Sequence, residues 1–134
     1  MAIDRSEFDP FRVDVVPNRD EVRVCPVGEL DLATVPLVDS ELAELWSVGF
    51  AQLVLDLRDV CFLDSTGIRM LLSWQAASSA DGVQFSVIAG PPVVERVLEV
   101  AGVTDHLTYA SPDAVDRTPR RPMASRIGRR GRRG

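Results

Sequence analysis

Residues 53–72 run LVLDLRDVCFLDSTGIRMLL, and this stretch decides the fold. The stretch begins with a near-continuous run of apolar residues. This run predicts a strand, over residues 51–57, that is buried on both faces. Charged residues interrupt the run at 56–59, and a second apolar piece at 60–63 carries the chain across the end of the sheet. After DSTG at 64–67, apolar side chains recur at helical spacing. The stretch therefore predicts two hydroxyl groups at the start of a helix that follows a buried strand.

The motif Asp64-Ser65-Thr66-Gly67 has a plain structural interpretation. Asp, Ser and Thr are preferred at the N-cap of a helix, so such side chains are most often caps and nothing more. Gly67 needs a further reason, because glycine within a helix costs roughly 1 kcal/mol relative to alanine. The close approach of another backbone, or of a binding partner, is such a reason.

The composition predicts one globular domain with a modest core, since the chain has 134 residues and 46% of them are hydrophobic. No apolar run is long enough to span a bilayer, and residues 1–7 lack the apolar core of a signal peptide, so we expect a cytoplasmic protein. Cys25 and Cys61 are the only cysteines. Both stand in apolar, strand-like surroundings and are predicted to be buried free thiols in a reducing compartment.

The net charge of −5 conceals two oppositely charged parts. All fifteen basic residues are arginines, and eight of them follow Asp116, where the chain has no acid. The rest of the chain sets seven arginines against twenty acids, a formal charge of −13, to which the eight later arginines add +8. An acidic body disfavours nucleic acid as its main ligand.

This charge pattern suggests three segments. We expect a flexible lead-in over residues 1–10, a folded domain over 11–116 and a disordered Arg-rich tail over 117–134. Besides a solvated extension, the alternatives for the tail are contact with nucleic acid or an anionic membrane, and folding back on the acidic body.

Strands and helices alternate along the domain, which predicts crossover connections and a partly parallel α/β sheet. The first two strands flank the turn residues Asn18-Arg19-Asp20 and predict an antiparallel hairpin, so the sheet should be mixed. In chain order we predict strands at 11–16 and 21–27, a loop at 28–31, a helix at 32–47, the central strand at 51–57, a helix at 65–80 closed by Gly82, a strand at 84–89, a helix at 93–101, a short strand at 106–109 and a helical turn at 112–115.

Enzymatic and metal chemistry have little support in the sequence. A Ser65 nucleophile would need a base, and the single histidine is His106, beside Asp105. Leu63 stands where the nucleophile elbow of a hydrolase has glycine, so a small serine hydrolase is a distant third interpretation. The cysteines are far apart in sequence and no Gly-rich phosphate loop occurs, so we expect no metal and no cofactor.

A hydroxyl at a helix start can instead accept a phosphoryl group from another protein. Phosphoserine carries about −1.5 to −2 charges at neutral pH. Next to Asp64, at about 6 Å and an effective dielectric near 20, each unit of that charge is repelled by roughly 2–3 kcal/mol. Water screens this repulsion in the free protein, whereas a docked interface removes the water. Phosphorylation could therefore switch binding off without unfolding the domain.

Two motifs in this order resemble the STAS domain, and in particular the bacterial anti-sigma factor antagonists, also called anti-anti-sigma factors. The first comprises the apolar strand, the acidic turn and Asp-Ser-Thr-Gly-Ile within residues 53–68, and the second is Gly-Glu-Leu-Asp at 28–31. The third predicted helix and Ala-Gly-Val at 101–103 match the family's closing segment, so the resemblance covers residues 11–110. It implies an α/β STAS fold, a mixed four- to five-stranded sheet packed with about four helices.

The resemblance also implies roles for individual residues. Ser65 matches the phosphorylation site of regulated family members, and Thr66 is a second candidate acceptor. Asp64 matches the acid implicated in partner recognition and in the phosphoryl-transfer step. Gly67 completes that motif on the partner-binding surface, and Asp31 in the Gly-Glu-Leu-Asp loop would lie near the partner-facing end.

The implied partner is an anti-sigma factor that is also a Ser/Thr kinase with a histidine-kinase-like ATPase fold. The unphosphorylated chain would capture this kinase and free a sigma factor, and a PP2C-type phosphatase would reset it. The ATP site belongs to the kinase, so this chain would be no enzyme and need no cofactor. STAS domains also occur in transporters and signalling assemblies, so an adaptor subunit without a phosphorylation cycle is the second interpretation.

Met70 and Trp74 lie four residues apart on the predicted helix 65–80, one turn after Ser65 and offset from its main apolar stripe. If exposed, they would form an apolar anchor for the partner, because Trp and Met are enriched in interfaces. Otherwise they belong to the core. A buried Trp74 would exclude the anchor.

Overall fold

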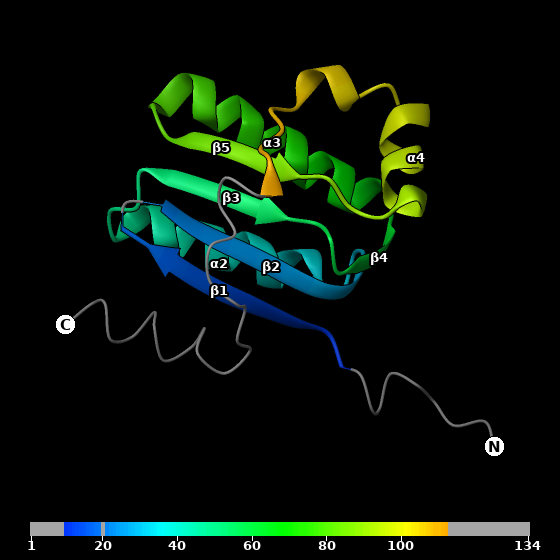
Figure 1. Ribbon diagram of the computed structural model, residues 1–134, viewed down its shortest axis with the longest axis horizontal. Helices are drawn as coiled ribbons and strands as arrows, with labels where there is room; N and C mark the ends of the chain where they lie inside the picture. The colour runs from blue at the N-terminus through cyan, green and yellow to red at the C-terminus, as the bar shows by residue number, and fades with distance from the viewer. Residues whose placement is uncertain (1–9, 20, 113–134) are drawn as a thin grey trace.

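The computed structural model describes residues 10–19 and 21–112 as one mixed α/β fold (Figure 1). In chain order its elements are β1 (Arg12–Asn18), β2 (Glu21–Leu30), α2 (Val35–Ser47), β3 (Gln52–Asp56), β4 (Val60–Leu63), α3 (Ser65–Asp81), β5 (Gln84–Ile88), α4 (Pro92–Val100) and a 3-10 turn (Thr104–His106). The predictions for the lead-in, for the end of the helical turn at 112–115 and for the Arg-rich tail fall outside the described residues.

The five-stranded sheet has the order β1-β2-β3-β5, and β4 pairs with the far end of β2. β1 runs antiparallel to β2, whereas β2, β3, β4 and β5 are mutually parallel. The predicted hairpin, the mixed sheet and the central position of β3 are therefore confirmed. The predicted burial of β3 on both faces is also confirmed, since its residues from Leu53 to Asp56 are all buried.

The core lies between the sheet and the two long helices. Val24 of β2, Leu55 of β3 and Val87 of β5 stand in one register row, and all three are fully buried. Figure 1 shows α2 and α3 on the same face of the sheet, with α4 at the end where β4 lies. Alternation within each strand sends every second side chain to this face.

The predicted loop at residues 28–31 is wrong in part, because β2 continues to Leu30. Glu29 pairs with Phe62 and Leu30 with Leu63, so β4 supplies hydrogen-bond partners that a sequence pattern cannot reveal. The register shifts between Gly28 and Glu29. Gly28 has a φ of 122°, a conformation that glycine adopts readily.

Two further expectations fail in part. Residues 106–109 form no strand, since Thr104–His106 is a 3-10 turn and only Tyr109 makes a single parallel bridge, to Val87. Cys25 is buried as predicted, but Cys61 is exposed. Only the first and last residues of β4 point into the core, so its two middle residues face outward.

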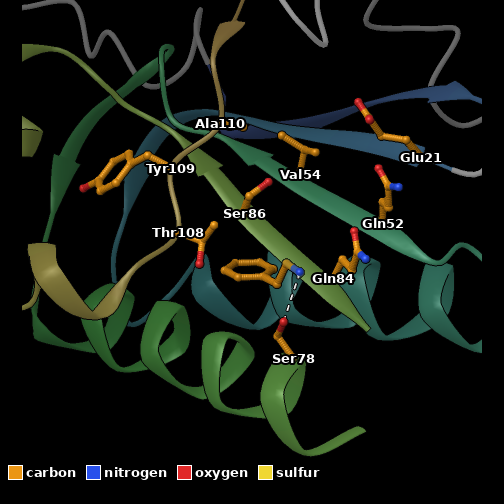
Figure 2. Close-up of a pocket in the computed structure, with 10 residues that line it drawn as sticks. Glu21, Gln52, Val54, Ser78, Gln84, Ser86, Thr108, Tyr109 and Ala110 are labelled. Atoms are coloured by element: carbon orange, nitrogen blue, oxygen red, sulfur yellow. Dashed lines mark hydrogen bonds between the residues drawn. The ribbon is translucent and has the colours of Figure 1, made fainter. Parts of the chain in front are cut away.

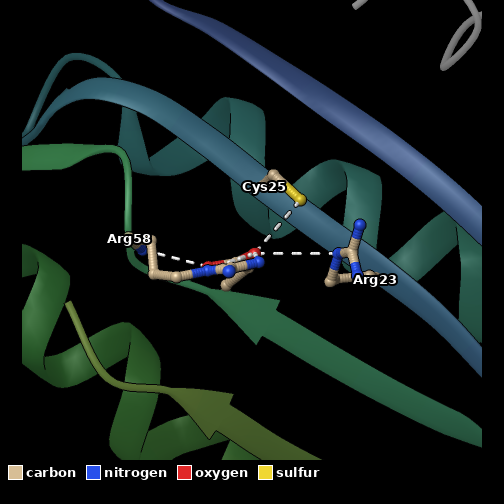
Figure 3. Close-up of polar contacts among 4 residues, drawn as sticks. Arg23, Cys25 and Arg58 are labelled. Carbon is tan, nitrogen blue, oxygen red and sulfur yellow. Dashed lines mark hydrogen bonds and ion pairs between the residues drawn. The ribbon is translucent and has the colours of Figure 1, made fainter. Parts of the chain in front are cut away.

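The opposite face of the sheet carries a buried polar cluster around Asp56 (Figure 3). The Asp56 carboxylate accepts hydrogen bonds from the Arg58 backbone N–H at 3.0 Å and from Arg58 Nη2 at 2.7 Å. Arg23 Nε of β2 lies 3.7 Å from Asp56 Oδ2, and Cys25 Sγ lies 3.8 Å from it. This cluster ties β2 to the turn that leads from β3 into β4.

Candidate functional site

The candidate site lies where the parallel strands end and three helices begin. β2 leads into α2, β4 leads into α3 and β5 leads into α4, so the three helix N-termini lie at the carboxyl end of the sheet. In open α/β sheets this end is where ligands and partners commonly bind. Each helix N-terminus adds unpaired N–H groups and partial positive charge.

Asp64 is the N-cap of α3, as predicted. Its backbone is extended, and Oδ1 accepts hydrogen bonds from Thr66 N–H at 2.9 Å and Gly67 N–H at 3.3 Å. Ser65 is the first residue of the helix and its side chain is exposed, whereas Thr66 is half-buried. The cap therefore presents the Ser65 hydroxyl to solvent beside a carboxylate.

Gly67 is buried where α3 meets the sheet. A Cβ at this position would collide with Leu63 Cδ1 and stand 3.3 Å from the Leu30 carbonyl oxygen. The predicted close approach of another backbone is thus found within the chain itself. Gly67 shapes the site by letting α3 start against the end of β2.

Asp31 lies in the turn that precedes α2, whose N-cap residue is Thr34. Its Oδ1 accepts hydrogen bonds from Ala33 N–H at 3.0 Å and Thr34 N–H at 3.2 Å. The Thr34 hydroxyl donates to the Glu29 carbonyl at 2.7 Å and closes the turn. Asp31 thus has a structural role in this turn, in addition to any role toward a partner.

The β2–β4 pairing brings Asp31 and Asp64 together. Leu30 and Leu63 are register partners, and the next residue on each strand is the aspartate. The Asp64 N–H also donates to the Leu30 carbonyl at 3.3 Å. Since paired strands lie about 4.8 Å apart, the two acidic turns that the sequence singled out form one surface.

Met70 and Trp74 do not belong to that surface. Met70 is 5% exposed and Trp74 is 8% exposed, so both are core residues and the anchor interpretation is wrong. The Trp74 ring stacks on Phe85 and meets Trp46 edge-on, and its indole N–H donates to Asp39 Oδ1 at 2.8 Å. The space between α2, α3 and β5 needs large side chains, and Trp74 fills it.

The exposed apolar side chains at this end are ones that sequence reasoning missed. Leu32, which follows Asp31, is 73% exposed, and Phe62 of β4 is 47% exposed. Their sequence neighbours Asp31 and Cys61 border a hollow of about 600 Å³, together with Phe11, Gly28, the acids Glu29 and Asp59, and the basic residue Arg12. The sequence held no signal for this, because β4 turns both of its middle residues outward and a run of four apolar residues does not reveal which of them are exposed.

The Ser65–His106 pair of the hydrolase interpretation is not brought together. His106 borders a surface hollow with Leu72, Gln75 and Ala76 of α3. Those residues follow Ser65 by 7 to 11 positions, which is roughly 10–16 Å along a helix.

Residues 10–19 and 21–112 contain neither a metal-binding group of side chains nor a membrane-spanning helix. In that part of the chain no three His, Cys, Asp or Glu side chains are grouped so that they could hold a metal ion. No helix there combines the length and the apolar character needed to cross a membrane.

Comparison with known proteins identifies proteins whose sequences are similar to this chain. The chain is 36% identical over 70 residues to the Osmosensory protein A of Mycobacterium tuberculosis, a match that spans 52% of this chain and 44% of that protein. It is 26% identical over 78 residues to the Anti-sigma-B factor antagonist of Staphylococcus aureus, which is 58% of this chain and 72% of that protein. The chain thus matches less than half of the first relative's length.

Solved structures share the fold. An anti-sigma factor antagonist from Mycobacterium paratuberculosis superposes with a TM-score of 0.66 at 24% identity, covering 88% of this chain and 96% of that one. The phosphorylated form of SpoIIAA, a Bacillus cell fate determinant, superposes with a TM-score of 0.59 at 19% identity, covering 80% and 97%.

The family comparison agrees with both the fold and the motifs. The family model described as "Mlab, STAS domain" matches residues 12–109, well over half of the chain. The STAS architecture expected from the strand and the DSTG helix start is confirmed, and the chain belongs to the STAS domain family.

Proposed function

We propose that this STAS domain is an anti-sigma factor antagonist that is switched off by phosphorylation of Ser65. In its unphosphorylated form it binds an anti-sigma factor that is also a Ser/Thr kinase, and so frees a sigma factor. A PP2C-type phosphatase removes the phosphate and restores binding. In this proposal the ATP site and the catalytic groups belong to the kinase.

The observation that carries the proposal is the position of Ser65. It is the exposed first residue of α3, directly after the N-cap Asp64 and beside the Asp31 turn. A kinase can reach this hydroxyl without unfolding the helix. The relatives support the same interpretation, because one is named an Anti-sigma-B factor antagonist and another was solved in a phosphorylated form.

Electrostatics explains why a phosphate at Ser65 would act on binding rather than on folding. The helix dipole favours a negative group at this position by about 0.3–1 kcal/mol. Repulsion from Asp64 is of the order of 2–3 kcal/mol per unit charge at an effective dielectric near 20, and water at the open surface reduces it. A docked partner excludes that water, so an added charge at the interface costs several kcal/mol.

The surroundings of Ser65 suggest the chemistry of the partner surface. Leu32 and Phe62 offer exposed apolar contact, and the hollow bordered by Asp31 and Cys61 carries three acids, Glu29, Asp31 and Asp59, against one basic residue, Arg12. A complementary partner has an apolar patch bordered by basic side chains. Leu32 and Phe62 replace Met70 and Trp74 as the proposed apolar contacts.

The test is intact mass after incubation of the full chain with ATP and a recombinant anti-sigma factor kinase that binds it. We expect wild type to gain one phosphate and Ser65→Ala to gain none. Ser73→Ala, which alters an exposed serine of the same helix, is the matched control and should behave as wild type. Ser65→Asp should bind the kinase at least tenfold more weakly than wild type.

Each result has a distinct meaning. A phosphate that persists in Ser65→Ala would mean that another residue is the phosphorylation site, and Thr66 would be examined first. No phosphate from an active kinase that binds the chain contradicts the switch. The second candidate, a STAS adaptor in a signalling or transport assembly, then stands, and it is favoured by a family match whose description names a STAS domain and no sigma factor.

A further inference from the structure

A second hollow lies at the other end of the sheet from Ser65. It has a volume of about 400 Å³ and is bordered by the first residues of β2, β3 and β5, by Ser78 of α3 and by residues 108–110 (Figure 2). Ser78 follows Ser65 by 13 positions, which is about 20 Å along a helix. The volume falls within the usual range for small-molecule sites.

The hollow contains an ordered row of hydrogen-bonding side chains. Glu21, Gln52 and Gln84 are register partners on three adjacent strands and stand in line in Figure 2. Neighbouring strands are about 4.8 Å apart, so the row offers one carboxyl and two amide groups over about 10 Å. Ser86 and Thr108 add hydroxyl groups beside the row.

The wall at residues 108–110 is held rigidly. Thr108 N–H donates to Gln75 Oε1 at 2.9 Å, and Gln75 Nε2 donates to Thr108 Oγ1 at 3.1 Å. The backbone of this segment bonds to Val87 on both sides, through Val87 N–H to the Thr108 carbonyl and Ala110 N–H to the Val87 carbonyl, each at 2.8 Å. The hollow is therefore a preformed feature of the described fold.

The side chains that line the hollow indicate which class of ligand it can bind. None of the described lining residues is basic, so the hollow disfavours anions such as phosphates and carboxylates. Amides and hydroxyls both donate and accept hydrogen bonds, as do the hydroxyl groups of a sugar. Burial raises the pKa of Glu21, with Arg23 opposing the shift, which agrees with a carboxyl partly withdrawn from water.

We propose that this hollow binds an uncharged polyhydroxylated molecule, a sugar or polyol of about disaccharide length, along the row Glu21–Gln52–Gln84. Successive hydroxyl groups of the ligand pair with the carboxyl and the two amides. The site is separate from the Ser65 surface, so this proposal does not depend on the phosphorylation switch.

The composition of the chain allows a direct test. It contains only three glutamines, Gln52, Gln75 and Gln84, so their side-chain amide signals are few in the NMR spectrum of the full ¹⁵N-labelled chain. Titration with trehalose should shift the Gln52 and Gln84 amide signals along a saturating curve. The side-chain amide of Asn18 is the internal control, because Asn18 does not line the hollow and its signal should stay unchanged.

Variants and a charged probe complete the test. Gln52→Leu and Gln84→Leu should each weaken trehalose binding about tenfold, as expected for loss of one hydrogen bond to the ligand. Asn18→Ala is the matched control, since Asn18 pairs with Glu21 in the same row but does not line the hollow. Glucose should bind more weakly than trehalose, and glucose 6-phosphate more weakly than glucose. Shifts that grow linearly and equally at all side chains, or binding that survives both leucine variants, would overturn the proposal.

Discussion

At the scale of single residues, Tyr109 shows how one side chain joins distant parts of the chain. Its hydroxyl donates to Glu95 Oε1 of α4 at 3.0 Å, while Glu95 Oε2 accepts the Gly90 N–H at 2.9 Å. Burial, followed by the hydrogen bond to Glu95 and that residue's negative charge, raises the pKa of Tyr109 from 10.0 to about 12. A phenolate there would face a carboxylate, so the folded chain retains the proton.

Because Tyr109 is the only tyrosine, phenolate absorbance in the ultraviolet measures this group alone. We expect its titration midpoint near pH 12 in the folded chain and near 10 in urea. The folded-state pKa is raised, so this group's contribution to stability is complete below pH 10 and is lost as the pH rises through about 12. Glu95→Gln should move the folded midpoint toward 10. A wild-type midpoint of 10 in the folded chain would contradict the contact.

At the scale of elements, α3 is specified at both ends by local sequence. Asp64 caps its start, and Gly82 at its end has a φ of 81°, the left-handed conformation that closes many helices. Neither signal depends on the tertiary structure, which is why the predicted bounds of this helix agree with the observed ones to one residue. The helix must hold its first turn for Ser65 to be presented in a defined way.

The cap can be separated from the negative charge by two substitutions. Asp64→Ala removes the acceptor for the Thr66 and Gly67 N–H groups and should lower the free energy of unfolding by about 1 kcal/mol. Asp64→Asn keeps a side-chain oxygen and should change it by only a few tenths. Urea unfolding followed by circular dichroism measures both. Equal losses in the two variants would mean that the charge, and not the cap, stabilises α3.

At the scale of the whole molecule, polar groups buried in the sheet connect the central strands to the site. Asp56 has no exposed side-chain surface, and the Arg23 side chain is 2% exposed. The Asp56 carboxylate also accepts hydrogen bonds from the backbone N–H and the guanidinium group of Arg58. These bonds shape the turn before β4. Because β4 leads directly into α3, this turn helps set where Ser65 emerges.

Removing that carboxylate should be costly. Asp56→Ala leaves buried guanidinium charge without its counter-charge, a change that typically costs about 3–5 kcal/mol. Glu99→Gln, at an exposed position of α4, is the control and should lie within about 0.5 kcal/mol of wild type. Thermal and urea unfolding measure both. A loss below about 1 kcal/mol for Asp56→Ala would show that the cluster is replaceable by solvent.

The sequence by itself determined the α/β class, the order of the elements, the hairpin, the α3 cap and the exposed hydroxyl of Ser65, because periodicity and capping are local properties of the chain. It did not determine the features that depend on which strands pair and which faces pack together. The β2–β4 ladder extended β2 to Leu30 and set Asp31 beside Asp64. Packing between α2 and β5 buried Trp74, and the outward turn of β4 exposed Cys61 and Phe62. Those outcomes depend on which faces meet in three dimensions, and the pattern of apolar residues along the chain does not specify which faces those are.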